Sequence, residues 1–454
     1  MADGSSYPRV LVIGQPFNHR SGGGVTLSNL FEGWPRDRIA AAVSVGPQIE
    51  HDVCDRYYLL GSDENVWRWP LSLVRRRSTP PSGTESQIPA EGRMQSGDAA
   101  SPGRAANWLH AGLDMLGVRD ELRTLRMSPP LRSWIRGFAP DIVYSHLHDL
   151  PGVLLVEQIT HEFGYPVAVH MMDDWPNFLY EHGALRGVVR GHMDRKLRSL
   201  IDGAASCLAI GDAMASEYGA RYGRTFLPFH NPVDLERWDA LAATYLGECD
   251  RPPDGRLHVV YAGRLGIGAT DSIVDVADVV SDMASHGEPV SMLVNTPNID
   301  NPAATHMAAL PGVVVTPAGE YDRVPGLMES ADVLLLPSDF DDASARYMRL
   351  SMPTKVAEYL ASGRPVLTYA PRGSAIAEYA RAGGWSLIVD ERDPAALRKA
   401  LELLIADTGL RTTMGARARG CAEERHDARR VRASFKAALA AGAMRVSGGR
   451  GPRS

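Results

Sequence analysis

The chain has 454 residues, of which 44% are hydrophobic and 22% are charged, a composition typical of folded globular proteins. This length exceeds what one compact core usually holds, so we expect two domains. The formal net charge of −6 creates no basic field, which argues against nucleic acid as a partner.

The amino terminus runs directly into a strand pattern and lacks the charged and then apolar layout of a signal peptide. No apolar run reaches the ~20 residues that cross a bilayer. The four cysteines, Cys54, Cys207, Cys249 and Cys421, show no CxxC spacing, which fits a reducing compartment. We therefore expect a cytoplasmic protein without a transmembrane segment, with peripheral contact to the inner face of the membrane left open.

In the first half, short β-rich runs alternate with helical patterns such as residues 153–164, which predicts a parallel α/β sheet. The expected strands are residues 9–14, 41–46, 57–60, 141–146, 166–171, 205–210 and 225–230. Residues 75–104 interrupt this series and are rich in Ser, Pro, Gly and charge. Such a segment buries too little apolar surface to order itself, so we expect a flexible insertion.

A polar, turn-rich stretch at residues 247–256 precedes a second series of strands. These strands are expected at residues 257–263, 290–295, 312–317, 332–338, 365–369 and 385–390. A helix follows at residues 393–404, with Asp393 as N-cap and Pro394 in its first turn.

The whole pattern predicts an α/β protein with two Rossmann-like, doubly wound domains. We expect the first domain at residues 1–235 and the second at residues 236–426. A helix at residues 427–443 is expected to pack back towards the first domain, and residues 444–454 to form a flexible tail.

The first strand is followed by a polar loop and by Gly22, Gly23 and Gly24, which open a helix. In open α/β sheets ligands bind beyond the carboxyl ends of the strands, where loop and helix amides hold anions. Three glycines would let a diphosphate or a sugar approach the backbone closely. A flexible turn is the alternative, and the spacing is not the dinucleotide-binding fingerprint.

Arg264 follows the strand at residues 257–263 and places a permanent fork of hydrogen-bond donors where a phosphate would lie. A surface salt bridge is the alternative interpretation of this arginine.

The stretch SMPTKVAEYLASGRPVL, residues 351–367, combines helix start and stop residues with a lysine and a glutamate three positions apart. Pro353 suits a first helical turn, and Gly363 ends the helix. Lys355 and Glu358 lie three positions apart and so share one face near its amino end. A glutamate there can accept two hydrogen bonds from ribose hydroxyls, and the lysine can meet phosphates. An ion pair on a solvated face is the alternative.

Taken together, these motifs resemble the nucleotide-binding region of GT-B glycosyltransferases, especially family 4. The residues that carry the resemblance are PTKVAEYLASGRPVL, YAGRL, HNPVDLERW, DIVYSHLHD, PVAVHMMDDWP and the glycine loop. It covers most of both domains, outside the insertion and the tail. It implies two domains that face each other across a cleft, with a nucleotide sugar bound between them.

The resemblance also implies roles for individual residues. Glu358 would hold the donor ribose and Arg264 its diphosphate. Gly23 and Gly24 would lie in the first-domain loop that faces the donor. His170, at the end of a first-domain strand, would act near the sugar as the catalytic residue, where an imidazole can bond a hydroxyl or the reacting centre. A histidine that simply satisfies a strand end is the alternative.

The chain departs from the family pattern at two places. Members usually carry a lysine five or six positions after the arginine, where this chain has Ala269 and Thr270. Many carry a second glutamate where this chain has Leu350. The diphosphate charge would then be neutralised by Lys355 or by one of three arginines, Arg346, Arg349 and Arg372.

Two acidic clusters, Asp173–Asp174 and Asp339 with Asp341 and Asp342, could be interpreted as metal sites. The resemblance implies catalysis without a bound metal, through amides, basic side chains and a helix dipole. We therefore predict no required metal and no cofactor besides the nucleotide-sugar donor.

The predicted activity is transfer of a hexose-like unit from a nucleotide-diphosphate sugar to an acceptor hydroxyl, with retention of configuration. The acceptor, whether a glycan, a lipid-linked sugar or a small molecule, is not written in the sequence, nor are the donor's base and sugar. The alternatives are a nucleotide-sugar epimerase of the same architecture and a non-catalytic GT-B scaffold. A nicotinamide oxidoreductase fits least, because neither domain carries G-x-G-x-x-G with a suitably placed acid.

Overall fold

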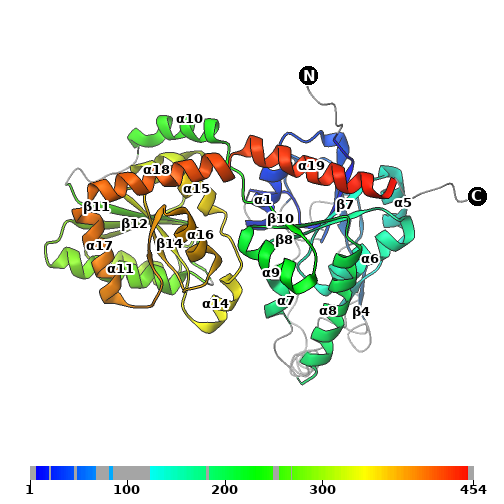
Figure 1. Cartoon of the computed structure of the whole chain (residues 1–454), viewed down its shortest axis with the longest axis horizontal. Coiled ribbons are helices and arrows are strands. Elements are labelled where there is room, and N and C mark those ends of the chain that lie inside the picture. Colours follow the sequence, from blue (N-terminus) through cyan, green and yellow to red (C-terminus); the bar gives the residue numbers. More distant parts are fainter. Residues whose placement is uncertain are drawn as a thin grey trace, which may run out of the picture. The chain divides into compact units, whose positions relative to one another are not determined.

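The computed structural model describes most of the chain, in eight segments. These are residues 7–19, 22–44, 49–67, 81–84, 123–179, 184–248, 255–266 and 268–447. The chain divides into two compact units, each an α/β structure (Figure 1). Unit 1 comprises Met1–Phe229 with Arg432–Ser454, and unit 2 comprises His230–Val431. Within the described residues, no helix is both long and apolar enough to cross a membrane.

The sheet of unit 1 has eight strands in the order β10-β9-β8-β7-β1-β2-β3-β5. All of its pairs are parallel except β3 with β5. Its strands are β1 (Val10–Gly14), β2 (Ile39–Ser44), β3 (Tyr57–Leu60), β5 (Gly83–Thr84), β7 (Ile142–His146), β8 (Val167–Met171), β9 (Ser206–Ala209) and β10 (Phe226–Pro228). Seven of these strands confirm those expected from the sequence. They were predictable because central parallel strands are buried on both faces and therefore appear in the sequence as apolar runs.

Helices pack on unit 1's sheet, and polar caps set the ends of several. They are α1 (Gly22–Phe31), α5 (Pro129–Phe138), α6 (Leu150–Phe163), α7 (Trp175–Phe178), α8 (Arg186–Gly203) and α9 (Asp212–Tyr222). In α6, the Asp149 side chain accepts a hydrogen bond from Gly152 N at 2.8 Å, and Gly164 ends the helix at φ 67°.

The last helix, α19 (Ala428–Ser447), begins in unit 2, and its residues from Arg432 onward pack in unit 1. Its Phe435 ring lies 5.0 Å from Phe31 and 5.8 Å from Tyr144, between ring centroids. The helix continues to Ser447, into the residues predicted as a tail, and residues 448–454 lie outside the described part.

The structure describes only residues 81–84 of the predicted insertion at residues 75–104. Here the sequence analysis missed β5, which pairs antiparallel with β3. It also missed a separate two-stranded sheet formed by β4 (Asn65–Trp67) and β6 (Arg123–Leu125). The rest of the predicted insertion lies outside the described residues.

Unit 2 contains a fully parallel six-stranded sheet in the order β13-β12-β11-β14-β15-β16. Its strands are β11 (Leu257–Ala262), β12 (Val290–Thr296), β13 (Val313–Pro317), β14 (Val333–Pro337), β15 (Val366–Tyr369) and β16 (Ser386–Val389). All six were expected from the sequence.

The helices of unit 2 alternate with these strands. They are α10 (Leu235–Tyr245), α11 (Thr270–Ser285), α12 (Pro302–Ala308), α13 (Val324–Ser330), α14 (Asp342–Met348), α15 (Lys355–Ala361), α16 (Ala375–Gly383), α17 (Pro394–Ala406) and α18 (Thr408–Arg425). Helix α15 begins at Lys355, so placing Pro353 inside its first turn was wrong; Pro353 O instead accepts a hydrogen bond from Val356 N at 3.1 Å.

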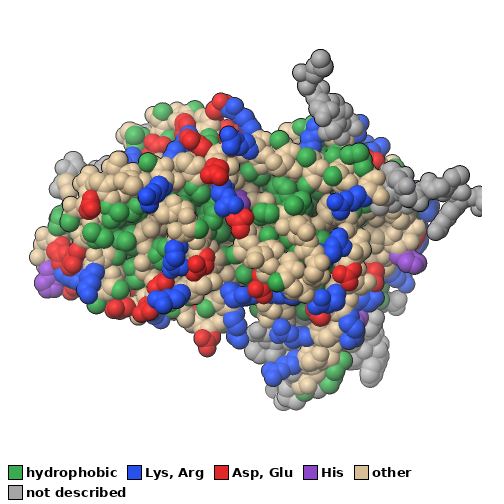
Figure 2. All heavy atoms as spheres, in the orientation of Figure 1, with side chains coloured by type: hydrophobic (Ala, Val, Ile, Leu, Met, Phe, Trp, Pro, Cys, Tyr) green, Lys and Arg blue, Asp and Glu red, His purple; other side chains and the backbone are tan. Residues whose placement is uncertain are grey.

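Basic and acidic side chains are interspersed over the face of unit 2 in Figure 2, and many of them pair. Arg392 contacts Asp275 at 2.8 Å, and Arg372 and Arg381 both contact Asp390, at 3.1 and 2.9 Å. Such exposed pairs neutralise one another and contribute little to stability.

Each sheet has one point where the strand order reverses. In unit 1 this switch lies between β1 and β7, and in unit 2 between β11 and β14. Ligands of doubly wound sheets bind at the carboxyl ends of the two strands that flank such a switch. The fold therefore offers one candidate site in each unit.

Candidate functional site

The predicted site residues divide between the two units, and the unit 2 group gathers around the loop after β11. Tyr261 Oη donates a hydrogen bond to Arg264 O at 2.7 Å and so folds this loop back on its strand. Lys355 Nζ donates to the same phenol oxygen at 2.9 Å and lies 4.2 Å from the ring centroid. Gly263, at φ 153°, leaves the space for the lysine, because a Cβ there would clash with Nζ. The fold therefore brings the Lys355 ammonium to the Arg264 loop.

Arg264 itself is exposed at the carboxyl end of β11. Across the switch, Asp339 follows β14 and is buried. Its Oδ1 accepts a hydrogen bond from Ser272 N in the first turn of α11 at 2.8 Å. Burial raises the pKa of Asp339, although the bonds from Ser272 oppose that shift. Asp341 likewise caps α14 through Ser344 N at 3.0 Å, so both carboxylates act as helix caps.

Glu358 carries a contact that the sequence analysis did not anticipate. Its Oε1 accepts a hydrogen bond from Tyr321 Oη at 2.7 Å, from the short 3₁₀ turn Tyr321–Arg323. Burial raises the pKa of Glu358, and the Tyr321 bond and the Lys355 charge partly offset the shift. A carboxylate has about four lone-pair sites, so one phenol leaves acceptor capacity for further hydroxyls.

The positions where the chain departs from the family pattern have ordinary structural roles. Leu350 is buried, and the Thr270 hydroxyl donates to Gly266 O at 2.9 Å at the start of α11. Among the alternative arginines, Arg372 contacts Asp390 and Glu391 at 3.1 and 3.0 Å, so its charge is already compensated. Lys355 is a basic side chain that the structure holds directly at the Arg264 loop, through Tyr261.

In unit 1, glycines shape the space between β1 and α1. At Gly14, φ is 112° and a Cβ would lie 2.6 Å from His146 O, so the two strand ends approach closely. Gly24 is buried, and a Cβ there would clash with the Asn18 side chain. Gly23 is partly exposed, and the position of its missing Cβ lies 3.3 Å from His146 Cε1. The glycines therefore admit the loop and the His146 ring side by side.

The structure places His170, the predicted catalytic residue, inside unit 1. Its side chain on β8 is fully buried, and its Nδ1 lies 2.6 Å from Tyr144 Oη. Burial lowers the pKa of His170 to about 3, so the ring is neutral at physiological pH. His170 pairs in register with His146 on β7, so both side chains point to the same face of the sheet.

His146 is therefore the imidazole that lies beside the predicted glycines, and the sequence analysis did not select it. Burial, followed by the nearby His148 and His170, lowers the pKa of His146 to about 3. Its Nδ1 has no hydrogen-bond partner among the residues that the structure describes. The position of His146 at the end of an expected strand could have marked it as a candidate site residue. Its place next to β1 follows only from the strand order of the folded sheet.

The first acidic cluster proposed from the sequence has a structural role in unit 1. Asp174 is fully buried and accepts hydrogen bonds from Tyr218 Oη at 2.8 Å, Arg221 Nη1 at 3.0 Å and Asn177 Nδ2 at 2.6 Å. These partners neutralise the carboxylate and join the start of α7 to α9.

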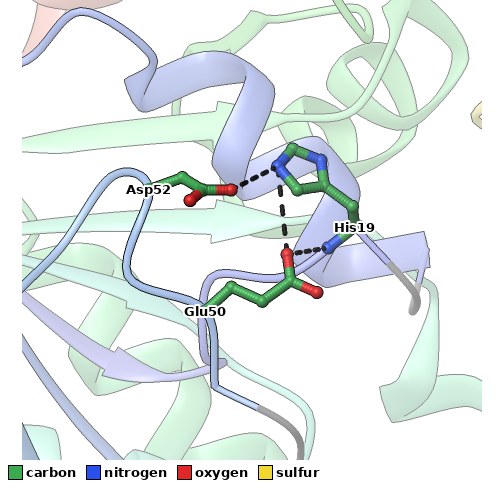
Figure 3. Close-up of side chains that lie close together, drawn as sticks. All are labelled: His19, Glu50 and Asp52. Carbon is green, nitrogen blue, oxygen red and sulfur yellow. Dashed lines mark hydrogen bonds and ion pairs between the residues drawn. The ribbon is translucent and has the colours of Figure 1, made fainter. Parts of the chain in front are cut away.

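Among the described residues, one group has the side chains and spacing to hold a metal ion: His19, Glu50 and Asp52 (Figure 3). His19 Nε2 lies 3.9 Å from Glu50 Oε2 and 3.6 Å from Asp52 Oδ2. Glu50 also accepts a hydrogen bond from His19 N at 2.9 Å. The group is largely exposed, and the sequence analysis did not single it out.

Residues 256–407 match the family model described as glycosyl transferases group 1. This segment contains Arg264, Lys355 and Glu358, so the resemblance to these enzymes is confirmed at the level of the group. The narrower assignment to family 4 stays a prediction. Comparison with curated protein sequences found no significant match.

Three solved structures that are similar to this chain match nearly the full length of both chains. HepE from Anabaena in complex with UDP has a TM-score of 0.58 and 13% identity, over 95% of this chain and 99% of that one. Sucrose-phosphate synthase from Thermosynechococcus elongatus has a TM-score of 0.62 and 11% identity, over 97% and 100%. WaaG, a glycosyltransferase involved in lipopolysaccharide biosynthesis, has a TM-score of 0.57 and 13% identity, over 94% and 98%. The chain has the fold of GT-B glycosyltransferases, with two Rossmann-like domains.

Proposed function

We propose that this protein is a glycosyltransferase that moves a sugar from a nucleotide-diphosphate sugar to an acceptor hydroxyl. The observation that carries the proposal is the Lys355–Glu358 pair, inside the segment that matches the group 1 model, with Lys355 fixed at the Arg264 loop. Similar structures were solved with UDP and with UDP-glucose, which supports a nucleotide-sugar donor.

In this proposal, unit 2 holds the nucleotide. The Glu358 carboxylate accepts hydrogen bonds from the ribose hydroxyls, while Arg264 and Lys355 hold the diphosphate. As the glycosidic bond breaks, negative charge accumulates on the leaving diphosphate, and preorganised positive groups stabilise that charge. The Tyr261 ring attracts the Lys355 ammonium, which lies 4.2 Å from the ring centroid, and so helps to orient it.

We further propose that the anomeric configuration is retained and that no resident metal is required. The support is the family resemblance, together with the basic side chains of Arg264 and Lys355 at one loop, which can supply positive charge. The roles of Gly23 and Gly24 in facing the donor, and of His170 near the transferred sugar, belong to the same proposal. The acceptor is a hydroxyl compound of undetermined class.

The test begins with calorimetry of the full chain against UDP, GDP, ADP and dTDP, then against their sugar conjugates. Glu358→Ala should weaken the best-bound nucleotide at least about tenfold, because each hydrogen bond to a charged group contributes ~1.5–3 kcal/mol. Glu378→Ala is the matched control. It removes a glutamate from a different helix, α16, where the carboxylate pairs with Arg381 and has no proposed role in binding the nucleotide. Equal nucleotide affinity in the wild type and Glu358→Ala would refute the donor site.

Product analysis separates the enzyme classes. Transfer to an added acceptor mixture, detected by mass spectrometry, supports the transferase. An epimerised sugar without acceptor would indicate the epimerase, and nucleotide binding without any turnover would indicate a non-catalytic protein. The non-catalytic outcome is included because this chain has the buried Leu350 where many members of the family carry a glutamate.

A further inference from the structure

The loop after β1 and the segment before β3 bring together three side chains that carry metal-binding atoms. They are His19, Glu50 and Asp52, called the His19 cluster below. Figure 3 shows the His19 ring and both carboxylates turned toward one another. His19 and Glu50 are 31 residues apart in the chain, so the fold assembles this cluster and no local sequence motif does.

The backbone of the His19 cluster is held by contacts to neighbouring residues. Glu50 N donates a hydrogen bond to Phe17 O at 3.1 Å, and Tyr57 Oη donates to Glu50 O at 2.9 Å. Arg36 Nη2 donates to Asp52 O at 2.9 Å. These bonds leave only side-chain rotations to be fixed when a ligand binds, which lowers the entropic cost of binding.

The spacing of the three donor atoms is that of ligands around one ion. His19 Nε2 lies 3.6 Å from Asp52 Oδ2 and 3.9 Å from Glu50 Oε2. Both distances exceed the ~2.7–3.2 Å of an N–H···O hydrogen bond. A Zn²⁺ ion with bonds of ~2.0–2.2 Å places its ligand atoms up to ~4 Å apart. Glu50 Oε2 also accepts a hydrogen bond from His19 N at 2.9 Å, and a carboxylate oxygen has a second lone pair for an ion.

The donor types in the His19 cluster select among metal ions. An imidazole nitrogen and carboxylate oxygens are both ordinary ligands of Zn²⁺, and three protein ligands leave a fourth position for water. Mg²⁺ and Ca²⁺ instead prefer oxygen ligands alone, so the imidazole disfavours them. Two carboxylates supply the negative charge that a divalent ion requires.

We propose that the His19 cluster binds Zn²⁺ through His19 Nε2 and one carboxylate oxygen from each of Glu50 and Asp52. The bound ion cross-links the loop that follows β1 to the segment that precedes β3, and so restrains both. The inference does not depend on the proposed function, in which no metal takes part, because Zn²⁺ binding is measured without a nucleotide or a sugar.

Calorimetry of the full chain with Zn²⁺, after treatment with a chelator, tests the site. His19→Ala and Asp52→Asn each remove one ligand, and both side chains are at least half exposed, so the fold should persist. Zn²⁺ affinity should fall at least about tenfold in each, because even a change behind a metal ligand costs ~10–100-fold. Mg²⁺ should bind more weakly than Zn²⁺, and equally in the wild type and His19→Ala.

His306→Ala is the matched control. His306 is as exposed as His19, and its Nε2 lies 3.0 Å from Asp278 Oδ1, but the pair has no third metal-binding side chain beside it in the described part of the chain. His306→Ala should bind Zn²⁺ as the wild type does. An equal loss of affinity in His306→Ala and His19→Ala would overturn the proposal, because Zn²⁺ would then bind exposed histidines in general.

Two further measurements locate the ion and its effect. In protein labelled with ¹⁵N-histidine, with the His19 signals assigned by His19→Ala, Zn²⁺ should shift Nε2 more than Nδ1. Zn²⁺ should also slow hydrogen exchange in peptides that cover residues 15–19 and 49–52 in the wild type, but not in His19→Ala.

Equal Zn²⁺ affinity in the wild type, His19→Ala and Asp52→Asn, or unmoved His19 signals at saturating Zn²⁺, would overturn the site. The His19 cluster would then be a surface ion pair between a protonated imidazole and two carboxylates. Zn²⁺ binding with unchanged hydrogen exchange in both peptides would overturn the cross-link.

Discussion

The loop after the central strand of unit 2 gathers basic side chains. The corresponding loop of unit 1 combines glycines and a buried histidine with two carboxylates, because Glu50 and Asp52 lie beside His19. In unit 2, Arg264 and Lys355 bring positive charge, and Asp339 already occupies the first turn of α11. In unit 1, the end of β7 presents His146 to Gly23 at the start of α1. Two sheets with the same kind of switch point thus carry different side chains there.

This difference suits different ligand groups in the two units. A diphosphate is recognised by permanent positive charges, which act over several ångströms and weaken with salt. Sugar hydroxyls carry no charge and are recognised by short, directional hydrogen bonds in a site that excludes water. The comparison therefore predicts that salt and pH affect the two units differently.

The largest expected effect comes from removing the unit 2 charges. In Arg264→Ala/Lys355→Met, the affinity for the best-bound nucleoside diphosphate should fall at least about 100-fold, because two charge-assisted contacts of ~1.5–3 kcal/mol each are lost. The affinity for the matching nucleoside should hardly change. Calorimetry at two salt concentrations should also show a weaker salt dependence in the variant. Equal losses for nucleoside and diphosphate would mean that these residues act through the fold.

His170 tests whether the histidines of unit 1 are separate from nucleotide binding. His170→Ala should leave the nucleotide affinity unchanged but lower the transfer rate about tenfold or more, because the resemblance assigns this residue to the sugar. His170→Asn keeps a polar partner for Tyr144 and should retain more activity. Wild-type transfer rates in His170→Ala would contradict the assignment and leave His170 as a buried structural residue.

The neutral histidines also predict a pH dependence of stability. The folded-state pKa values of His146 and His170 are about 3, below the ~6.5 of an unfolded histidine. Between these values the unfolded chain binds protons that the folded chain does not, so the free energy of unfolding falls as pH falls. Each histidine contributes up to about 1.4 kcal/mol per pH unit.

Urea denaturation between pH 7 and pH 5 measures this slope. His146→Phe should flatten it, because one buried titrating group is removed, whereas the exposed control His161→Phe should not. The same slope in the wild type and His146→Phe would show that His146 does not stay neutral in the folded chain.

The smallest expected effect concerns the tyrosine on Glu358. Tyr321→Phe removes a hydrogen bond that lowers the pKa of this carboxyl, so the pKa should rise further and the ribose acceptor should be ionised less. Nucleotide affinity should fall about threefold, with the loss growing as pH falls. Calorimetry at pH 6 and pH 8 tests this. A gain in affinity would instead show that Tyr321 competes with the ribose.

Much of the fold could be predicted because its signals are local. Apolar runs between turn residues identify the central strands of both sheets, and Asp393 with Pro394 marks the start of α17. The Lys355–Glu358 pair could be found for the same reason, since residues three apart on a helix share a face whatever surrounds them. The short strands β4, β5 and β6 have no comparable signal, because they are set by their pairing partners.

The sequence by itself therefore determined two α/β series, their strands and the charged residues of unit 2. Only the tertiary structure decided which tyrosines hold Lys355 and Glu358, and that His146 lies beside Gly23 while His170 is bonded to Tyr144. The physical reason is strand order. β1 and β7 are neighbours in the sheet although a long stretch of chain separates them, and no local periodicity records which strand ends will meet.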